Sequence, residues 1–146
     1  MSEIIVGIDG SGHSALALEW AGREAAVRKI PLTVITVYPT MVGYTGYSVS
    51  CPSDEELAQQ AQQAAEEQVD KVLAGLDEAS RPLSVTVRGV AGLPADELLS
   101  ASGGADMVVV GSRGAGGFRK LRLGSVASQV AHHAHLPVVI IPAETI

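Results

Sequence analysis

The sequence predicts an α/β fold in which a five-stranded, parallel, open twisted sheet carries helices on both faces. Two observations lead to this prediction. Five short apolar runs alternate with segments in which apolar residues recur at helical spacing. The first run, residues 3–9, and the last, residues 137–142, are apolar at almost every position, which is typical of parallel strands buried on both faces. Strict alternation of strands and helices implies right-handed crossovers.

The N-terminal half supplies two of the strands. After the strand at residues 3–9, residues 10–29 have a helical pattern that Ser11 or Gly12 would cap, and residues 32–38 form the second strand, which Pro39 closes. We expect the helix to bury one stripe of its side chains, made of Leu16, Trp20, Ala21, Glu24 and Val27.

A long connection without any period, residues 40–52, follows the second strand. Ser53 and Glu56 then form a capping box that opens the next helix. Apolar residues lie along one side of this helix: Leu57, Ala61, Ala65, Val69, Val72 and Leu76. We expect this side to cover the protein's own sheet, in preference to binding a partner.

The C-terminal half supplies three further strands. Residues 83–87 alternate between apolar and polar and predict the third strand. A short helix over residues 92–99 has a proline early and acids in its first turn. The fourth strand is predicted at residues 107–110, a helix at 125–135, and the fifth strand at 137–142.

Length and composition describe residues 1–146 as one globular domain, because 47% of the residues are hydrophobic and only 18% are charged. No apolar run approaches the ~20 residues that span a bilayer, the N-terminus does not resemble a signal peptide, and one cysteine, Cys51, cannot form an internal disulfide. We therefore expect a soluble, cytoplasmic protein with no membrane partner. A net charge of −6 argues against nucleic-acid binding.

Positive charge is concentrated in one glycine-rich loop after the fourth predicted strand. Four of the ten Lys and Arg residues lie there: Arg113, Arg119, Lys120 and Arg122. An acidic protein that gathers its cations in one loop is suited to hold a small anion, and phosphate is the first candidate.

The glycines of this loop support an anion site. Gly111 ends the strand where a Cβ would crowd an approaching ligand, and Gly114 allows a backbone conformation that other residues resist. Gly124 precedes a new helix, whose first N–H groups point outward with the positive end of the helix dipole; they belong to Ser125, Val126 and Ala127. The spacing fits neither a P-loop nor a dinucleotide fingerprint, and by itself it leaves a generic glycine-rich turn open.

The spacing Gly111-x2-Gly114-x9-Gly124-Ser125 resembles the nucleotide-binding pattern of the universal stress protein family, in its ATP-binding branch. IIVGIDGSGHSALALEWA resembles the first strand and helix of that family, LTVITV its second strand, GLPADELL its short helix and HLPVVIIP its closing strand. The resemblance covers essentially the whole chain. It implies a Rossmann-like fold of the adenine nucleotide alpha hydrolase type.

The resemblance implies a role for individual residues. Asp9 matches the acid that reaches the ribose or a phosphate-bound Mg²⁺, Gly7 lies where the backbone passes the adenosine, and Val37 matches the residue whose backbone reads the adenine edge. The loop around the ribose and phosphates corresponds to Val110, Gly111, Arg113 and Gly114, and the phosphate cradle to Gly124, Ser125, Val126 and Ala127. Many relatives have His or Arg where Arg113 stands. Asp9 is also suited to cap the following helix.

The resemblance implies a regulatory protein that binds ATP as a stress-response switch or partner-binding module. The alternative is an enzyme of the related ATP pyrophosphatase-like superfamily, although D-G-S-G-H-S matches its S-G-G-x-D-S loop poorly; slow ATP hydrolysis is the most activity we expect. A phosphorelay receiver would need an acid at the end of its third strand, where Val87-Arg88-Gly89 offers none. The run at residues 138–141 is apolar on both faces and comes last, so we expect it at a sheet edge, where unpaired backbone groups invite another strand. Relatives pair their last strand with its symmetry mate, which implies a homodimer through residues 138–141.

Several further residues have plain explanations. His132, His133 and His135 lie at a helix end, where a cation complements the dipole, and a metal site is disfavoured because adjacent residues face apart. His13 is either a solvated residue of the first helical turn or a phosphate contact. Tyr44 and Tyr47 belong to the long connection and are candidates for a lid over the adenine.

Overall fold

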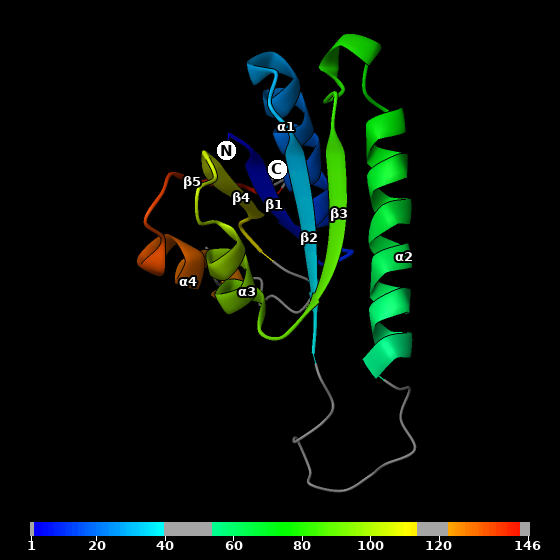
Figure 1. The fold of residues 1–146 in the computed structure, drawn as a ribbon. Coiled ribbons are helices and arrows are strands. Elements are labelled where there is room, and N and C mark those ends of the chain that lie inside the picture. Colours follow the sequence, from blue (N-terminus) through cyan, green and yellow to red (C-terminus); the bar gives the residue numbers. More distant parts are fainter. Residues whose placement is uncertain (1, 40–53, 114–122, 144–146) are drawn as a thin grey trace, which may run out of the picture.

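The computed structural model describes residues 2–39, 54–113 and 123–143. Its sheet has the strand order β3-β2-β1-β4-β5, and all neighbouring strands are parallel (Figure 1). The strands are β1 (Ile4–Ile8), β2 (Leu32–Tyr38), β3 (Val85–Ala91), β4 (Met107–Gly111) and β5 (Val138–Ile141). The helices are α1 (Gly12–Arg28), α2 (Asp54–Ala74), α3 (Pro94–Ala101) and α4 (Ser125–His133), with a 3₁₀ turn η1 (Glu78–Ser80). The predicted fold class is confirmed.

Strand order also decides between related folds. The chain moves outward from β1 to β3 on one side, then crosses to β4 and β5 on the other, so the order reverses between β1 and β4. Receiver domains have the flavodoxin-like order 2-1-3-4-5, which this sheet does not share. The structure therefore excludes the receiver fold and places the topological switch point between β1 and β4.

Two apolar layers cover the sheet. Ile4 and Val6 of β1 are fully buried in a cluster with residues of α1 and α2, whereas the intervening Ile5 is fully buried in a second cluster with residues of α3 and α4. Figure 1 shows the two helix pairs on opposite faces of the sheet. Because both faces are covered, β1 needs apolar residues at consecutive positions, which explains its unbroken run.

The buried stripe of α1 differs from the predicted one. Val27 is 77% exposed, and Leu16 and Trp20 are only partly buried. The helix packs instead through Leu18 and a set of small residues, namely Ser14, Ala17, Ala21, Gly22 and Ala25. The neighbouring α2 explains this choice, because a Cβ added at Gly22 would lie only 3.3 Å from Leu73 Cδ2. Close approach of α1 to α2 thus favours small side chains over large ones.

β3 begins and ends later than predicted. The expected strand at residues 83–87 contains Leu83, which is 92% exposed, and the observed strand continues through Gly89 to Ala91. Its limits are set by pairing with β2, from Leu32 opposite Val85 to Tyr38 opposite Ala91. The local alternation at 83–87 marked the strand correctly but could not reveal the length of its partner.

The side chain of Gln62 on α2 occupies the outer edge of β3. Leu32 N–H donates to the Ser84 carbonyl at 2.9 Å, so even-numbered residues of β3 direct their backbone groups toward β2 and odd-numbered ones point away. Gln62 Nε2 donates to the Val87 carbonyl at 2.7 Å, and Gly89 N–H donates to Gln62 Oε1 at 2.7 Å. These are the bonds that a residue of another parallel strand would make. The carboxamide therefore takes the place of a peptide group at this edge.

Replacing Gln62 with Leu should lower the free energy of unfolding by about 1–3 kcal/mol, because Val87 and Gly89 each lose a partner at a partly covered edge. Gln63→Leu is the matched control, since Gln63 is exposed and its amide donates to Glu67 of the same helix at 3.3 Å, with no bond to β3. This control should stay within about 0.5 kcal/mol of wild type. Urea denaturation measures both variants. Equal midpoints for the two would show that the Gln62 contacts contribute nothing.

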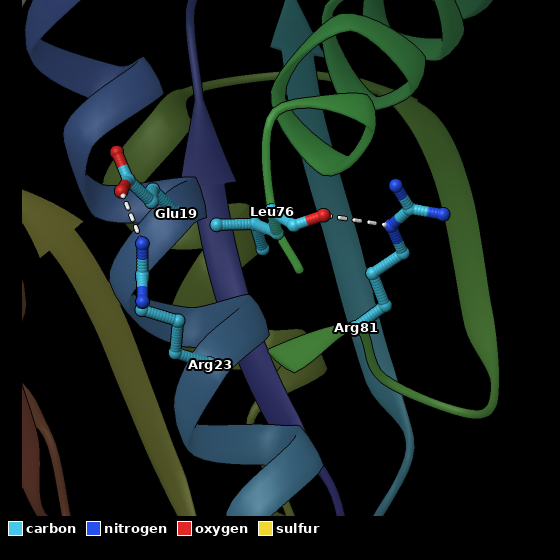
Figure 2. A network of polar contacts seen from close by, with 4 residues as sticks. All are labelled: Glu19, Arg23, Leu76 and Arg81. Atoms are coloured by element: carbon cyan, nitrogen blue, oxygen red, sulfur yellow. Dashed lines mark hydrogen bonds and ion pairs between the residues drawn. The ribbon is translucent and has the colours of Figure 1, made fainter. Parts of the chain in front are cut away.

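The C-terminal end of α2 is held by Arg81, which follows the 3₁₀ turn. Its Nε donates to the Leu76 carbonyl at 3.1 Å and its Nη2 to the Ala74 carbonyl at 3.4 Å, the first of which is seen in Figure 2. A guanidinium at this position satisfies carbonyl groups that the helix leaves open and complements its dipole. The ion pair of Glu19 and Arg23, also in Figure 2, joins exposed side chains at 3.1 Å and adds only a few tenths of a kcal/mol to α1.

Candidate functional site

The turn between β1 and α1 lies at the switch point and is organised by Asp9. Asp9 Oδ1 accepts hydrogen bonds from Ser11 N–H at 2.9 Å and from Ser11 Oγ at 2.5 Å. Ser11 is the N-cap of α1, and its Oγ accepts from Ser14 N–H at 3.2 Å. Ser11, one of the predicted caps, is therefore the residue that caps the helix. Asp9 does not cap the helix itself but accepts hydrogen bonds from Ser11. Asp9 remains exposed at the carboxyl end of the strand.

Two further features fix this turn. Gly10 has a φ of +84°, a conformation that residues with a Cβ resist, and no heavy atom lies within 4 Å of an ideal Cβ there. The backbone thus requires glycine at this position, and the Asp-Gly dipeptide was the available sequence signal. From α2, Gln68 Nε2 donates to the Ser11 carbonyl at 3.2 Å, which ties the turn to a second helix.

The carboxyl end of β4 lies against the start of α1. An ideal Cβ on Gly111 would be 3.1 Å from the His13 carbonyl oxygen and 3.4 Å from that of Arg113. We attributed this glycine to an approaching ligand, but the neighbour that excludes a side chain is the backbone of α1. The contact brings Asp9, His13 and Gly111 together at the carboxyl ends of β1 and β4. In open α/β sheets ligands bind beyond these ends, at the switch point.

Helix α4 begins beside the same strand end. Its N-cap, Gly124, has φ −72° and ψ 169°, and its N–H donates to the Ser112 carbonyl at 2.6 Å. No side chain caps the helix. Ser125 is exposed, while Ala127 is 1% exposed and belongs to the core, so Ala127 can offer a ligand only its backbone N–H.

The N-termini of α1 and α4, which carry the positive ends of the helix dipoles, both lie near the switch point. α1 and α4 start on either side of it, and neither has an acidic residue in its first turn. α3 follows β3 in the chain and carries Asp96 and Glu97 in its first turn. Acids usually stabilise a helix N-terminus. The Asp9 carboxylate already lies at the start of α1, whereas α4 has no acid in its first turn, so the N-terminus of α4 is the one suited to an external anion.

The adenosine side of the predicted site involves β1 and β2. The pairing of these strands ends at Ile8 and Thr36, so Val37 is the first residue of β2 beyond it. The bare Cα of Gly7 faces α3, and an ideal Cβ there would lie 2.7 Å from Leu98 Cδ1. Leu98 therefore already fills the space beside Gly7. Val110 is 3% exposed and its side chain packs in the core.

The remaining predicted residues are placed only in part. Arg113 is partly buried directly after Ser112. Outside the described residues lie the connection 40–52 and a set of single residues: Tyr44, Tyr47, Cys51, Ser53, Gly114, Arg119, Lys120 and Arg122. The structure thus describes the predicted phosphate cradle at residues 124–127, but not the loop residues 114–122.

The C-terminal histidines are exposed. The rings of His132 and His133 meet edge to face with centroids 4.7 Å apart, so the expectation that these adjacent side chains face apart was wrong. Among the described residues no group of three or more His, Cys, Asp or Glu side chains is arranged to hold a metal ion. Nor does any helix of the described ranges have the length and apolar character needed to cross a membrane.

Comparison with known proteins gives consistent matches. The sequence model of the universal stress protein family matches residues 1–142. A universal stress protein of Mycobacterium tuberculosis is 35% identical over 97% of this chain and 48% of its own length. Another from the same species is 37% identical over 94% of this chain and 47% of its own. The chain thus spans about half the length of the curated relatives it matches.

Solved structures agree with the fold. A universal stress protein in complex with cAMP is 26% identical, covers 97% of this chain and 96% of its own, and has a TM-score of 0.70. A universal stress protein from Lactobacillus plantarum has a TM-score of 0.78 at 21% identity, with 96% and 97% coverage. One from Archaeoglobus fulgidus in complex with dAMP has a TM-score of 0.63 at 21% identity, with 97% and 98% coverage. The last two likenesses establish the fold alone.

Proposed function

Because the chain belongs to the universal stress protein family, we propose that it binds ATP at the switch point and acts as a nucleotide-dependent switch or partner-binding module. The observation that carries this proposal is the N-terminus of α4, which has no acid in its first turn and is held beside the end of β4 by the bond from Gly124 to Ser112. The related protein with bound cAMP supports an adenine nucleotide as ligand. ATP is the finer assignment, suggested by the glycine and serine spacing.

In this proposal the phosphates lie at the entrance of α4. The N–H groups of Ser125, Val126 and Ala127 and the Ser125 hydroxyl donate to phosphate oxygens, and Gly124 leaves room for them. Arg113, with the basic residues of the adjoining loop, adds positive charge. The adenine lies beyond the end of the β1–β2 pairing, where the backbone of Val37 reads its edge; the remaining contacts come from Gly7, Val110, Gly111 and Gly114.

Asp9 suits a magnesium ion carried by the phosphates. Mg²⁺ prefers oxygen ligands and commonly takes one or two carboxylates together with substrate phosphates. Asp9 provides an exposed carboxylate at the end of β1, and the Ser11 contacts hold that carboxylate in place. The ion would offset phosphate charge. We propose binding and release of ATP as the central event, with at most slow hydrolysis; no contact among the described residues favours an adenylating enzyme.

Calorimetric titration with ATP, with and without Mg²⁺, tests this proposal. We expect binding in both titrations and tighter binding with Mg²⁺. Asp9→Asn keeps an acceptor oxygen for Ser11 but removes the charge, so its affinity for ATP should depend less on Mg²⁺. Equal affinities of the wild type in the two titrations would reject the role of Asp9. Absence of binding in both would reject the proposed function.

We also propose a homodimer that forms through β5. β5 is an edge strand, all four of its residues are partly exposed, and the backbone groups of Val138 and Ile140 point away from β4. The opposite edge is closed by Gln62. Light scattering should give twice the monomer mass. A particle of 15.0 kDa at micromolar concentration, with and without ATP, would contradict the proposal.

Two expectations about the whole chain remain proposals. Residues 1–146 act as one domain, although the curated relatives are about twice as long. The protein works in the cytoplasm without a nucleic-acid or membrane partner, which its negative charge supports.

A further inference from the structure

Ser112 lies where β4 and β5 separate, and it contacts three different segments. Its N–H donates to the Ile141 carbonyl at 2.8 Å, its carbonyl accepts from Gly124 N–H at 2.6 Å, and its Oγ accepts from Ala143 N–H at 3.0 Å. The side chain is 7% exposed. One residue therefore joins the last strand, the C-terminal end of the described chain and the entrance of α4.

The strand register shows that the Ser112 hydroxyl accepts a hydrogen bond that a regular strand ladder would direct to the Ser112 carbonyl. In the β4–β5 pair, Val108 N–H donates to the Pro137 carbonyl, and the alternation continues to Ser112 N–H and the Ile141 carbonyl. The next bond of a regular parallel ladder would run from Ala143 N–H to the Ser112 carbonyl. Ala143 N–H instead donates to Ser112 Oγ. The hydroxyl has taken the ladder position of the residue's own carbonyl.

This exchange frees the carbonyl for α4. Because the hydroxyl receives Ala143, the carbonyl turns to Gly124, the N-cap of the helix whose first N–H groups face the switch point. The bond joins the last described stretch before residues 114–122 to the start of α4. A hydroxyl is needed for this double contact, because alanine would leave Ala143 N–H, which is buried, without this acceptor or make it compete with Gly124 for one carbonyl.

We propose that Ser112 is the positioning residue of the nucleotide site: its hydroxyl allows β4 to separate from β5 while its carbonyl fixes the entrance of α4. This inference rests on the proposed function for its ligand, but the geometry it describes exists without one. Ser112 also links the site to β5. Ligand binding at α4 and the hydrogen bonds at the end of β5 therefore depend on the same residue.

Ser112→Ala tests the inference against Ser102→Ala. Ser102 is also a buried serine, 6% exposed. Its Oγ donates to the Leu99 carbonyl at 2.7 Å at the end of α3, and it makes no hydrogen bond to Gly124 or Ala143. Both variants lose one buried hydroxyl. We expect Ser112→Ala to bind ATP about 5- to 10-fold more weakly than wild type, and Ser102→Ala to bind as wild type does.

Hydrogen exchange of single amides, measured by NMR without nucleotide, separates this inference from the proposed function. In Ser112→Ala the amides of Gly124 and Ala143 should exchange about 5- to 10-fold faster than in Ser102→Ala. Unchanged exchange at both amides would overturn the positioning role, whether or not the wild type binds ATP. Faster exchange together with unchanged ATP affinity would overturn the link to the ligand. If the wild type does not bind ATP, the proposed function is rejected, and the exchange result alone decides whether Ser112 positions the start of α4.

Discussion

Gly124→Val should abolish measurable ATP binding and leave the fold intact. The backbone at Gly124 has φ −72° and ψ 169°, an extended conformation that valine adopts readily. Its N–H bond to the Ser112 carbonyl survives the change, because valine keeps that group. The substitution should therefore weaken ligand binding and leave the stability of the fold nearly unchanged.

The physical reason is local. A branched side chain at the helix entrance occupies the volume that phosphates need to reach the amides of Ser125 and Val126. Ser125→Ala is milder, since it removes one hydrogen bond to a charged group, about 1.5–3 kcal/mol or roughly 10- to 150-fold in affinity. Gly103→Val is the matched control, because Gly103 is an exposed glycine with no heavy atom near its ideal Cβ, in the turn after α3.

Calorimetry and thermal melts compare the three variants with wild type. Gly124→Val and Gly103→Val should both melt close to wild type, and only Gly103→Val should bind ATP. If Gly124→Val binds ATP as tightly as the control does, the phosphates do not lie at the entrance of α4.

Leu98→Ala should have the largest effect on stability, a loss of about 2–5 kcal/mol. Leu98 is 3% exposed, packs in the cluster of α3 and α4 with Ile5 and Val108, and fills the space that Gly7 leaves in the central strand. Truncation leaves a cavity that Gly7, having no side chain, cannot fill. Domains are stable by roughly 5–15 kcal/mol, so this one change removes a large share.

Leu93→Ala is the control for Leu98, since Leu93 precedes the same helix and is 68% exposed. It should change the free energy of unfolding by less than about 0.5 kcal/mol. Chemical denaturation measures both. Similar midpoints for the two variants would show that Leu98 does not hold α3 to the sheet.

Sequence patterns were most informative where they are local. The strand at 32–38 was predicted with the bounds that the structure has, because an apolar run there lies between Pro31 and Pro39. The N-terminus of α4 at Ser125 and the edge position of β5 were also predicted correctly. In each case a short signal, such as a glycine before a helix or a final apolar strand, was sufficient.

Features that depend on a neighbouring strand or helix were not predictable from such local patterns. β3 runs to Ala91 because β2 runs to Tyr38, which no pattern within residues 83–91 reveals. α1 buries small residues because α2 approaches closely at Gly22. The role of Ser112 follows from the register of β4 against β5, and that of Gln62 from the direction of backbone groups at the edge of β3. These properties belong to pairs of elements.

Titration of ¹⁵N-labelled protein with ATP and Mg²⁺ tests the central claim most directly. Binding at the switch point should shift the amide signals of Asp9, Val37, Gly111 and Ser125, which lie just after β1, near the end of β2, at the end of β4 and at the start of α4. The amide of Gly89, at the far edge of the sheet, should keep its position. No shifts at millimolar ATP, or shifts confined to the side of α2 and β3, would contradict the claim that the nucleotide binds between β1 and β4.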